Sequence, residues 1–120
     1  MDFDGVLHSY SSPWVNAETI PDAPVPGAID FLIEAQRFFN VAIYSSRSGQ
    51  SGGIAAMQTW LRQAALEQYD DEVTDTLMQN IEWPTQKPPA FLTLDDRVMQ
   101  FDGVWPTMPA LLNFQPWNRK

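Results

Sequence analysis

Apolar side chains recur at helical spacing in the middle of the chain. Between residues 27 and 39 they lie three or four positions apart, and Pro24 and Pro26 precede this stretch, where they do not interrupt it. This spacing predicts a helix over 27–39. The same criterion predicts a second helix over 53–69, and a third, acidic helix is expected over 70–80.

Two short apolar runs lack this spacing and predict strands. Residues 41–44 and 90–94 are continuous β-prone runs of the kind buried on both faces of a parallel sheet. We also expect a short strand over 98–101 and a helical turn over 109–114. Strands that alternate with helices are typical of doubly wound sheets. The sequence therefore predicts an α/β fold, with one three-layer, Rossmann-like domain over residues 1–120 and a parallel sheet.

The segment from residue 7 to residue 26 follows neither pattern. It holds four prolines and several serines, which favour turns. We expect a long loop here, and a loop of this length in a compact domain is usually functional. The only histidine of the chain, His8, is interpreted as a hydrogen-bonding partner within this loop rather than as a catalytic base.

Length and composition narrow the class of protein. A chain of 120 residues corresponds to one domain, and its 44% hydrophobic content is too high for a disordered tail. No apolar run approaches the roughly 20 residues of a membrane-spanning helix, and the acidic N-terminus does not match a secretory leader. The absence of cysteine excludes a disulfide framework and thiolate metal sites. We expect a cytoplasmic protein without a membrane partner.

The charge of the chain restricts its partners further. Seven basic and fifteen acidic residues give a net charge of −8, which repels nucleic acid and anionic lipid. The basic residues are scattered and form no patch in the sequence: Arg37, Arg47, Arg62, Lys87, Arg97, Arg119 and Lys120. Duplex nucleic acid is therefore not an expected partner, whereas a small phosphorylated substrate held by a few cations remains open.

Polar side chains gather where the predicted strands end. The three clusters are Asp2 with Asp4, Ser45 with Arg47, and Asp95 with Asp96. Ligands of open α/β sheets bind at the carboxyl edge of the strands. We therefore expect the three clusters to converge on one site.

The residue types in these clusters suit phosphoryl transfer. Crowded carboxylates raise each other's pKa unless a cation lies among them, and oxygen ligands without histidine or cysteine select a hard ion such as Mg²⁺. Together with Lys87 and a strand-end hydroxyl, such an ion would neutralise the oxygens of a transferring phosphoryl group. One aspartate could then attack phosphorus, and the aspartate two positions on could act as acid and base.

Four motifs follow one another along the chain. They are the Asp-x-Asp-Gly box from Asp2 to Gly5, the strand-terminal Ser45, the isolated Lys87, and the acidic pair Asp95-Asp96. In this order, and over nearly the whole chain, they resemble the haloacid dehalogenase superfamily of phosphohydrolases. The resemblance implies a Mg²⁺-dependent phosphomonoester hydrolase with the strand order of that superfamily.

The resemblance also implies a role for each motif residue. Asp2 would be the nucleophile that forms an aspartyl-phosphate, and Asp4 would be the general acid and base. Ser45 would donate a hydrogen bond to the phosphoryl group, and Lys87 would pair with its charge. The implied Mg²⁺ ligands are Asp2, Asp4 through its carbonyl oxygen, and Asp95 or Asp96.

A closer likeness concerns the substrate. The Ser45-x-Arg47 pattern and the Asp95-Asp96-Arg97 string are similar to the phosphatase domains of polynucleotide kinases, and small proteins of this pattern occur in bacteriophages. Gly5, Ser46 and Arg47 are predicted to bind substrate, and Arg47 would clamp a phosphate or sugar with its planar fork. The substrate implied is a nucleotide or the phosphorylated end of a polynucleotide. Residues 7–26 would form the flap and the minimal cap.

Two alternatives remain open. The strand expected to end at Asp2 holds only Met1 in this sequence, so the first strand of the sheet is predicted to be truncated. The chain could then be a catalytically idle module that binds Mg²⁺ or phosphate, or a subunit whose missing strand is supplied by a partner. An aspartyl-phosphate could also be passed to an alcohol rather than to water, which would make the protein a phosphotransferase.

Overall fold

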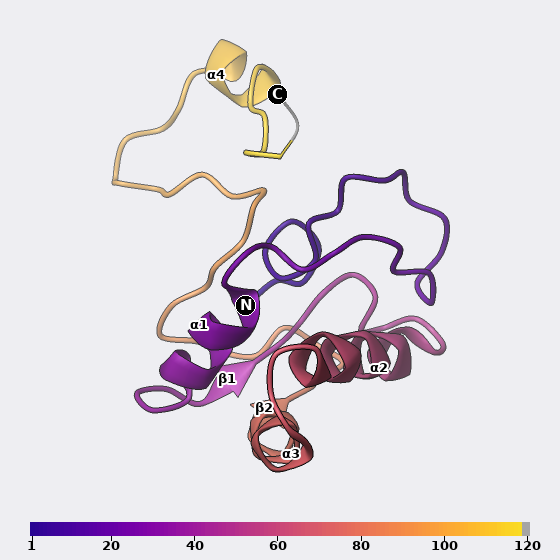
Figure 1. Ribbon diagram of the computed structural model, residues 1–120. Coiled ribbons are helices and arrows are strands. Elements are labelled where there is room, and N and C mark those ends of the chain that lie inside the picture. Colours follow the sequence, from indigo (N-terminus) through magenta and orange to yellow (C-terminus); the bar gives the residue numbers. More distant parts are fainter. Residues whose placement is uncertain (119–120) are drawn as a thin grey trace.

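Helices and two short strands alternate along the chain in the computed structural model, which describes residues 1–118 (Figure 1). The elements are α1 (Ala28–Ala35), β1 (Val41–Ala42), α2 (Gly53–Leu66), α3 (Asp71–Gln79), β2 (Ile81–Glu82) and α4 (Met108–Leu112). The helices α1, α2 and α3 and both strands form the body, whereas the segment that carries α4 extends away from it (Figure 1).

The two strands form a parallel sheet, as an α/β fold requires. Val41 lies opposite Ile81 and Ala42 lies opposite Glu82. The connection between the strands contains α2 and α3, because parallel neighbours need a crossover of a dozen or more residues. The prediction of an α/β protein is confirmed at this level, and the regular sheet in the described chain has two strands.

Backbone hydrogen bonds extend this sheet beyond its regular strands. The Met1 nitrogen donates to the Ala42 carbonyl oxygen at 2.6 Å, and the Tyr44 N–H donates to the Met1 carbonyl oxygen at 3.0 Å. On the other side, the Asp2 N–H donates to the Leu94 carbonyl oxygen at 2.8 Å. The order across the molecule is therefore Leu94, Met1–Asp2, β1 and β2.

Two of the predicted strands do not form. Residues 90–94 are an irregular segment, because the chain beside them offers only Met1 and Asp2, and one backbone bond does not make a ladder. Residues 98–101 are exposed and have no neighbouring strand within the described chain. Strand propensity records a fit to a pleated, half-buried surface, and such a surface is absent at both places.

The predicted helices form with shorter ends. The first ends at Ala35 rather than at residue 39, because residues 36–39 continue as hydrogen-bonded turns whose Phe38 and Phe39 side chains face solvent. The second helix, predicted over 53–69, ends at Leu66. The helical turn predicted over 109–114 forms as the short helix α4, Met108–Leu112. The third begins after Asp70, whose carboxylate accepts the Val73 N–H at 2.9 Å, an N-terminal cap.

The segment 7–26 is a loop, as predicted. The structure also shows that its two ends are joined by backbone hydrogen bonds. The Val25 N–H donates to the Leu7 carbonyl oxygen at 2.8 Å, and the Ser9 N–H donates to the Ala23 carbonyl oxygen at 3.0 Å. Between these bonds the chain forms neither helix nor strand. The two ends of the loop are thus held together beside the Asp2–Asp4 segment.

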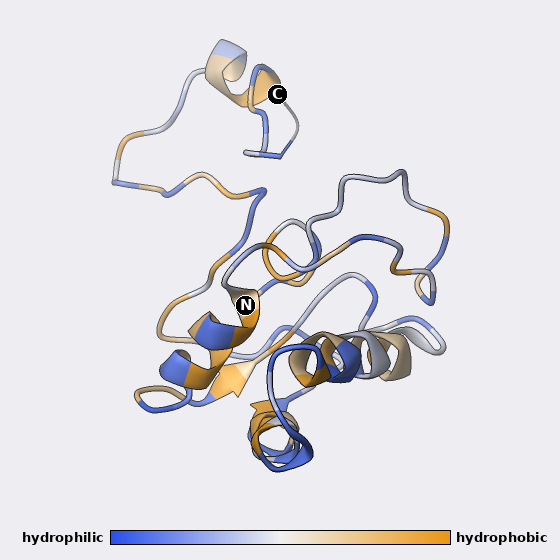
Figure 2. Cartoon of the chain, viewed as in Figure 1, coloured by the Kyte–Doolittle hydropathy of each residue, from blue (hydrophilic) through white to orange (hydrophobic). Residues whose placement is uncertain are grey.

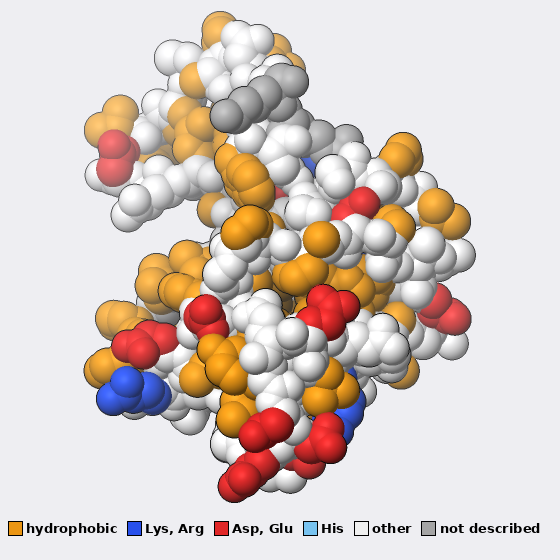
Figure 3. Space-filling view, in the orientation of Figure 1, with side chains coloured by type: hydrophobic (Ala, Val, Ile, Leu, Met, Phe, Trp, Pro, Cys, Tyr) orange, Lys and Arg blue, Asp and Glu red, His pale blue; other side chains and the backbone are white. Residues whose placement is uncertain are grey.

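The core lies between the helices and the short sheet. Its fully buried members include Phe3, Leu7, Ile29, Leu32, Ile43, Met57, Leu61 and Leu77. By contrast, the segment from Phe91 to Trp117 exposes many apolar side chains, seen as orange stretches in Figure 2 and as orange surface in Figure 3. The radius of gyration of 15.3 Å accordingly exceeds the roughly 14 Å expected for a compact chain of this length. No helix of residues 1–118 has the length and apolar character that a membrane crossing requires.

Candidate metal and phosphate site

Three carboxylates meet where the Met1–Asp2 strand ends. Asp2, Asp95 and Asp96 each offer one oxygen, and these oxygens lie within 4.8 Å of one another. The bond from the Asp2 N–H to the Leu94 carbonyl oxygen produces this meeting, because it fixes the start of the acidic pair beside the N-terminus. The structure thus brings together three side chains from two of the three predicted clusters.

The crowding of these carboxylates changes the acidity of Asp2. Burial raises the pKa of Asp2 to about 7, although the Phe3 N–H, 2.8 Å from its Oδ1, acts in the opposite direction. The neighbouring charges of Asp95 and Asp96 raise this pKa further. Without a cation, Asp2 therefore holds a proton through much of the pH range in which an ordinary aspartate is ionised.

The donor set fits a hard divalent cation. All three donors are carboxylate oxygens, which Mg²⁺ prefers over nitrogen or sulfur. Opposite ligands of an octahedral Mg²⁺ with bonds of about 2.1 Å lie about 4.2 Å apart, so a small inward movement of these oxygens suffices. A bound cation would also remove the repulsion that raises the pKa of Asp2.

We expect the stability of the metal-free protein to fall as pH rises from about 4 to about 8. A pKa raised in the folded state means that the folded protein binds the Asp2 proton more tightly than the unfolded chain does. This contribution is complete below the unfolded pKa of 3.8 and is lost as pH passes about 7. Its size is on the order of 2–4 kcal/mol, because solvent screens part of the interaction.

Urea unfolding in EDTA at a series of pH values measures this dependence, and Asp2→Asn is the control that should flatten it. The lowered pKa of Asp4 acts in the opposite direction only below pH 3.8, outside this window, whereas the lowered pKa of the Met1 ammonium acts in the opposite direction just below pH 8, in Asp2→Asn as well. A free energy of unfolding that is constant from pH 4.5 to 8 would contradict the assignment.

The second aspartate of the motif lies in a separate network. The Arg47 guanidinium binds the Asp4 carboxylate as a fork, with Nε 2.9 Å from Oδ2 and Nη2 3.1 Å from Oδ1. His8 Nδ1 lies 2.8 Å from the same Oδ1, and His8 Nε2 accepts the Asp22 N–H, so the ring proton resides on Nδ1. Burial alone would raise the pKa of Asp4, but the bonds from His8 and Arg47 outweigh it and hold this pKa below its ordinary value.

Arg47 reaches Asp4 from the turn that follows β1. The Ser45 Oγ accepts the Arg47 N–H at 3.2 Å, and the Ser48 Oγ accepts the Ser45 N–H at 3.0 Å, so two hydroxyls shape this turn. The Arg47 Nη1 donates to carbonyl oxygens of the 7–26 loop, those of Asn16, Ala17 and Thr19. The indole of Trp14 covers the guanidinium at 4.5 Å.

This environment bears on the predicted role of Arg47 in substrate binding. The exposed fraction of Arg47 is 1%, and its guanidinium is hydrogen-bonded to the Asp4 carboxylate and to carbonyl oxygens of the loop. In this conformation a substrate phosphate does not reach it. The geometry makes Arg47 a connector between the Asp-x-Asp-Gly segment and the 7–26 loop.

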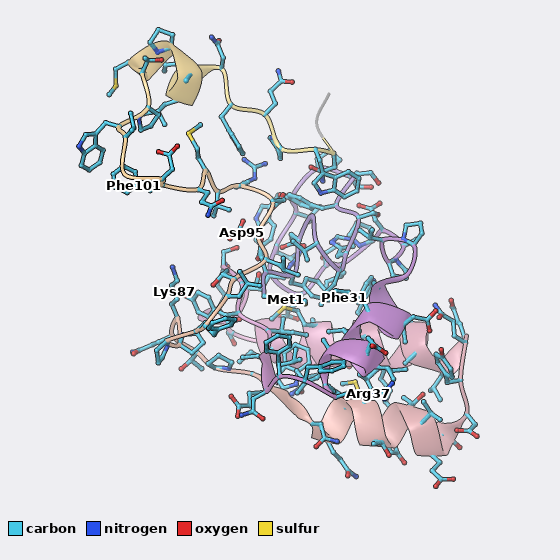
Figure 4. All side chains as sticks on the ribbon, turned by 90° about the vertical axis from the view of Figure 1, so that its left-hand side faces the viewer. Met1, Phe31, Arg37, Lys87, Asp95 and Phe101 are labelled. Atoms are coloured by element: carbon cyan, nitrogen blue, oxygen red, sulfur yellow. The ribbon has the colours of Figure 1, made fainter. Side chains whose placement is uncertain are left out.

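The remaining residues predicted to bind or activate substrate differ in their exposure to solvent. Ser45 is buried in the turn, whereas Ser46 is exposed and its carbonyl oxygen accepts a bond from Gln50 Nε2 at 2.8 Å. Lys87 is also exposed, on the long connection that leads from β2 past Asp95 (Figure 4), and it takes part in no ion pair of the described residues. The structure therefore does not bring Lys87 into contact with the acidic cluster.

Gly5 lies directly against the acidic cluster. Its φ of +79° is in the left-handed region, and a Cβ at this position would meet Asp96 Oδ2 at 2.1 Å. Its carbonyl oxygen accepts the Trp117 indole N–H at 2.7 Å. A glycine is thus required here for the close approach of Asp96, whatever its part in substrate binding.

Sequence reasoning missed three members of this region. The sequence carries no signal that Trp14 covers Arg47 or that Trp117 binds the Gly5 carbonyl. Asp22 was not considered, although it closes the loop by accepting the Ser12 N–H at 2.8 Å. The assignment of His8 to hydrogen bonding within the loop is confirmed.

Comparison with known proteins adds no relative to this description. No family model, no curated protein and no solved structure matches the chain.

Proposed function

We propose that this protein is a Mg²⁺-dependent phosphomonoester hydrolase that works through an aspartyl-phosphate on Asp2. The observation that carries the proposal is the meeting of the Asp2, Asp95 and Asp96 carboxylates at the end of the Met1–Asp2 segment, which bonds to β1 on one side and to Leu94 on the other. Asp2 would be nucleophile and metal ligand, and Asp95 and Asp96 would complete the set of carboxylate ligands. Bound Mg²⁺ would supply positive charge that orients the phosphoryl group and neutralises its oxygens.

The chain's own residues would perform the two steps. An Asp2 carboxylate oxygen attacks phosphorus, the bond from phosphorus to the ester oxygen breaks, and the alcohol leaves with a proton from solvent or an acid. Water then attacks phosphorus, the bond from phosphorus to Asp2 breaks, and inorganic phosphate leaves. The Ser45 Oγ accepts the Arg47 N–H, so its own O–H is left to donate. This O–H would donate a hydrogen bond to a phosphoryl oxygen.

The state of Asp4 favours one of these steps. With its pKa held below the ordinary value, Asp4 is ionised at neutral pH, which is the protonation state of a base for the attacking water, and release of its bonds to Arg47 and His8 would strengthen that base. It has no proton to give to the leaving alcohol in the conformation described. Phosphate esters whose leaving group needs no proton, such as nitrophenyl phosphate, are therefore the most suitable first substrates.

The arrangement of the layers, beyond the α/β class, is part of the same proposal. We infer a three-layer, Rossmann-like arrangement in which the Met1–Asp2 strand is central. Its support is the order Leu94, Met1–Asp2, β1, β2, with parallel bonds from Met1 to β1. The 7–26 loop, tied to Arg47 beside the Asp-x-Asp-Gly segment, would be the flap and minimal cap.

A small phosphorylated molecule, such as a nucleotide, or a short phosphorylated polynucleotide end is the proposed substrate class. The net charge of −8 supports the smaller ligands, because a long polyanion would be repelled along its length. A cytoplasmic location belongs to this proposal as the default expectation.

A second candidate is an idle module that binds Mg²⁺ or phosphate. Its support is the state of two motif residues, since Arg47 and His8 hold Asp4, and Lys87 is exposed and forms no ion pair with any of residues 1–118. In this alternative the acidic cluster binds a cation, but no residue completes the phosphoryl transfer.

Release of inorganic phosphate from nitrophenyl phosphate, with MgCl₂ or with EDTA, tests the hydrolase. We expect release with Mg²⁺ and its loss with EDTA, restored by added Mg²⁺. Release that EDTA leaves unchanged would overturn the proposal. Stabilisation by Mg²⁺ without any release would favour the idle module.

A further inference from the structure

The chain from residue 97 to residue 115 is an excursion that leaves the body after the acidic pair and then returns to it. None of these residues is buried, and bonds within the excursion hold its turns, such as that from the Ala110 N–H to the Thr107 Oγ at 3.3 Å. Figures 1 and 4 show the excursion carrying α4 and Phe101 away from the body. Packing against the body therefore does little to fix the position of the excursion.

The returning chain meets the Asp-x-Asp-Gly segment and the base of the 7–26 loop. Pro116 is buried, in contrast to the residues before it. The Trp117 indole N–H donates to the Gly5 carbonyl oxygen at 2.7 Å, and the Asn118 Nδ2 donates to the Ser9 carbonyl oxygen at 3.0 Å. Two side-chain donors and two backbone acceptors thus fix the point of return.

Gly5 is the residue through which this contact bears on the acidic cluster. Its N–H donates to the His8 carbonyl oxygen at 2.7 Å and its carbonyl oxygen accepts from Trp117, so its backbone is held on both sides. The Asp96 carboxylate occupies the space that a Cβ of residue 5 would fill. Glycine has more backbone freedom than any other residue. The Trp117 bond therefore restricts the backbone against which the Asp96 carboxylate rests.

The acidic pair lies between two attachments to the same short segment. Before the pair, the Leu94 carbonyl oxygen accepts the Asp2 N–H at 2.8 Å, and after it the excursion closes on Gly5 through Trp117. The carboxylates of the cluster repel one another when they are ionised, which favours their separation. If the second attachment were lost, the pair would be tethered on one side only and would gain freedom to move away.

We propose that Trp117 is a positioning residue of the candidate site: its bond to the Gly5 carbonyl closes a clamp that holds the acidic pair beside Asp2. The indole nitrogen is a donor only, so Trp117 acts through Gly5 and not as a ligand. The consequence of the clamp for cation binding rests on the proposed function, whereas the clamp itself does not.

Hydrogen exchange of the Asp2 amide, followed by NMR in EDTA, tests the clamp at its other attachment. Trp117→Phe keeps an aromatic ring and removes the N–H donor. We expect the Asp2 amide, which bonds to Leu94, to exchange about fivefold faster or more in this variant. The amide of Leu61, on the buried face of α2, should exchange at an unchanged rate because the body does not depend on the excursion.

Trp105→Phe is the matched control, because Trp105 lies on the same excursion and is 82% exposed. It should leave both exchange rates unchanged. An unchanged rate for the Asp2 amide in Trp117→Phe would overturn the proposal. Equal acceleration of the Asp2 and Leu61 amides would overturn it as well, because that result describes a general loosening of the fold and not a local clamp.

Calorimetric titration with Mg²⁺ gives a second measurement, which a purely structural role of Trp117 would not change. We expect the affinity for Mg²⁺ to fall about tenfold in Trp117→Phe and to stay unchanged in Trp105→Phe. Equal affinities of the two variants would contradict the positioning of the cluster. Accelerated exchange of the Asp2 amide in a protein that binds no Mg²⁺ would support the clamp and contradict the proposed metal site, so the two failures are distinguishable.

Discussion

Replacement of Asp2 by asparagine is expected to abolish phosphate release and, at the same time, to stabilise the metal-free protein above pH 7. The carboxylate is the proposed nucleophile, and loss of a nucleophile costs on the order of 10⁴-fold or more in turnover. The amide carries no charge, so the repulsion from Asp95 and Asp96 that raises the pKa of Asp2 disappears. Opposite signs for activity and stability distinguish this site from an ordinary structural aspartate.

The measurements are phosphate release from nitrophenyl phosphate in Mg²⁺ and urea unfolding in EDTA at pH 8. Glu67→Gln is the matched control, because it removes one negative charge at the exposed C-terminal end of α2, away from the cluster. We expect this control to leave both quantities nearly unchanged. Retention of turnover in Asp2→Asn would show that another group attacks phosphorus, and a loss of stability at pH 8 would contradict the crowding of carboxylates.

Replacement of Arg47 by methionine is expected to cost about 3–5 kcal/mol of unfolding free energy. The side chain is buried, binds Asp4 through two nitrogens and donates to three carbonyl oxygens of the 7–26 loop. Methionine would leave the Asp4 carboxylate buried without its main partner. Because small domains have only about 5–15 kcal/mol in total, this one side chain supports a large share of the stability.

Arg37→Met is the matched control for this prediction. Arg37 is 71% exposed and its Nη1 lies 3.5 Å from Glu34, a surface pair that contributes less than about 1 kcal/mol. Urea unfolding at pH 7 compares the two variants, and Arg47→Lys, which keeps the charge but not the fork, should lie between them. A loss in Arg47→Met no greater than that in Arg37→Met would contradict the buried network.

Local sequence patterns predict the helices well because a helix depends on contacts between residues a few positions apart. The apolar spacing that predicted the second helix corresponds to Met57, Leu61, Ala64 and Ala65 on the buried face of α2. The Asp70 cap sets the start of α3 in the same local manner. Only the ends shift, where Phe38 and Phe39 find no core to pack against.

Strands depend on neighbours that a sequence pattern does not contain. The run 90–94 has strand composition, yet its only backbone contact with the N-terminal strand is the bond from Asp2 to Leu94. The run 41–44 has neighbours on both sides, but the regular ladder covers only Val41 and Ala42. The length of a strand is thus limited by the length of the chain segment beside it.

The sequence by itself determined the helices, the long loop and the chemical inventory of the site: carboxylates, a strand-end serine and scattered cations. The tertiary structure alone decided how these groups are divided. Asp2 joins Asp95 and Asp96, across more than ninety residues, whereas Asp4, two positions away, joins Arg47 and His8. Side chains two positions apart on a regular strand point to the same face, but the chain turns at Phe3, whose carbonyl oxygen accepts the Val6, Leu7 and His8 N–H groups, so Asp4 leaves the face of Asp2. Spacing along the chain does not contain that information, because burial and charge pairing act through space.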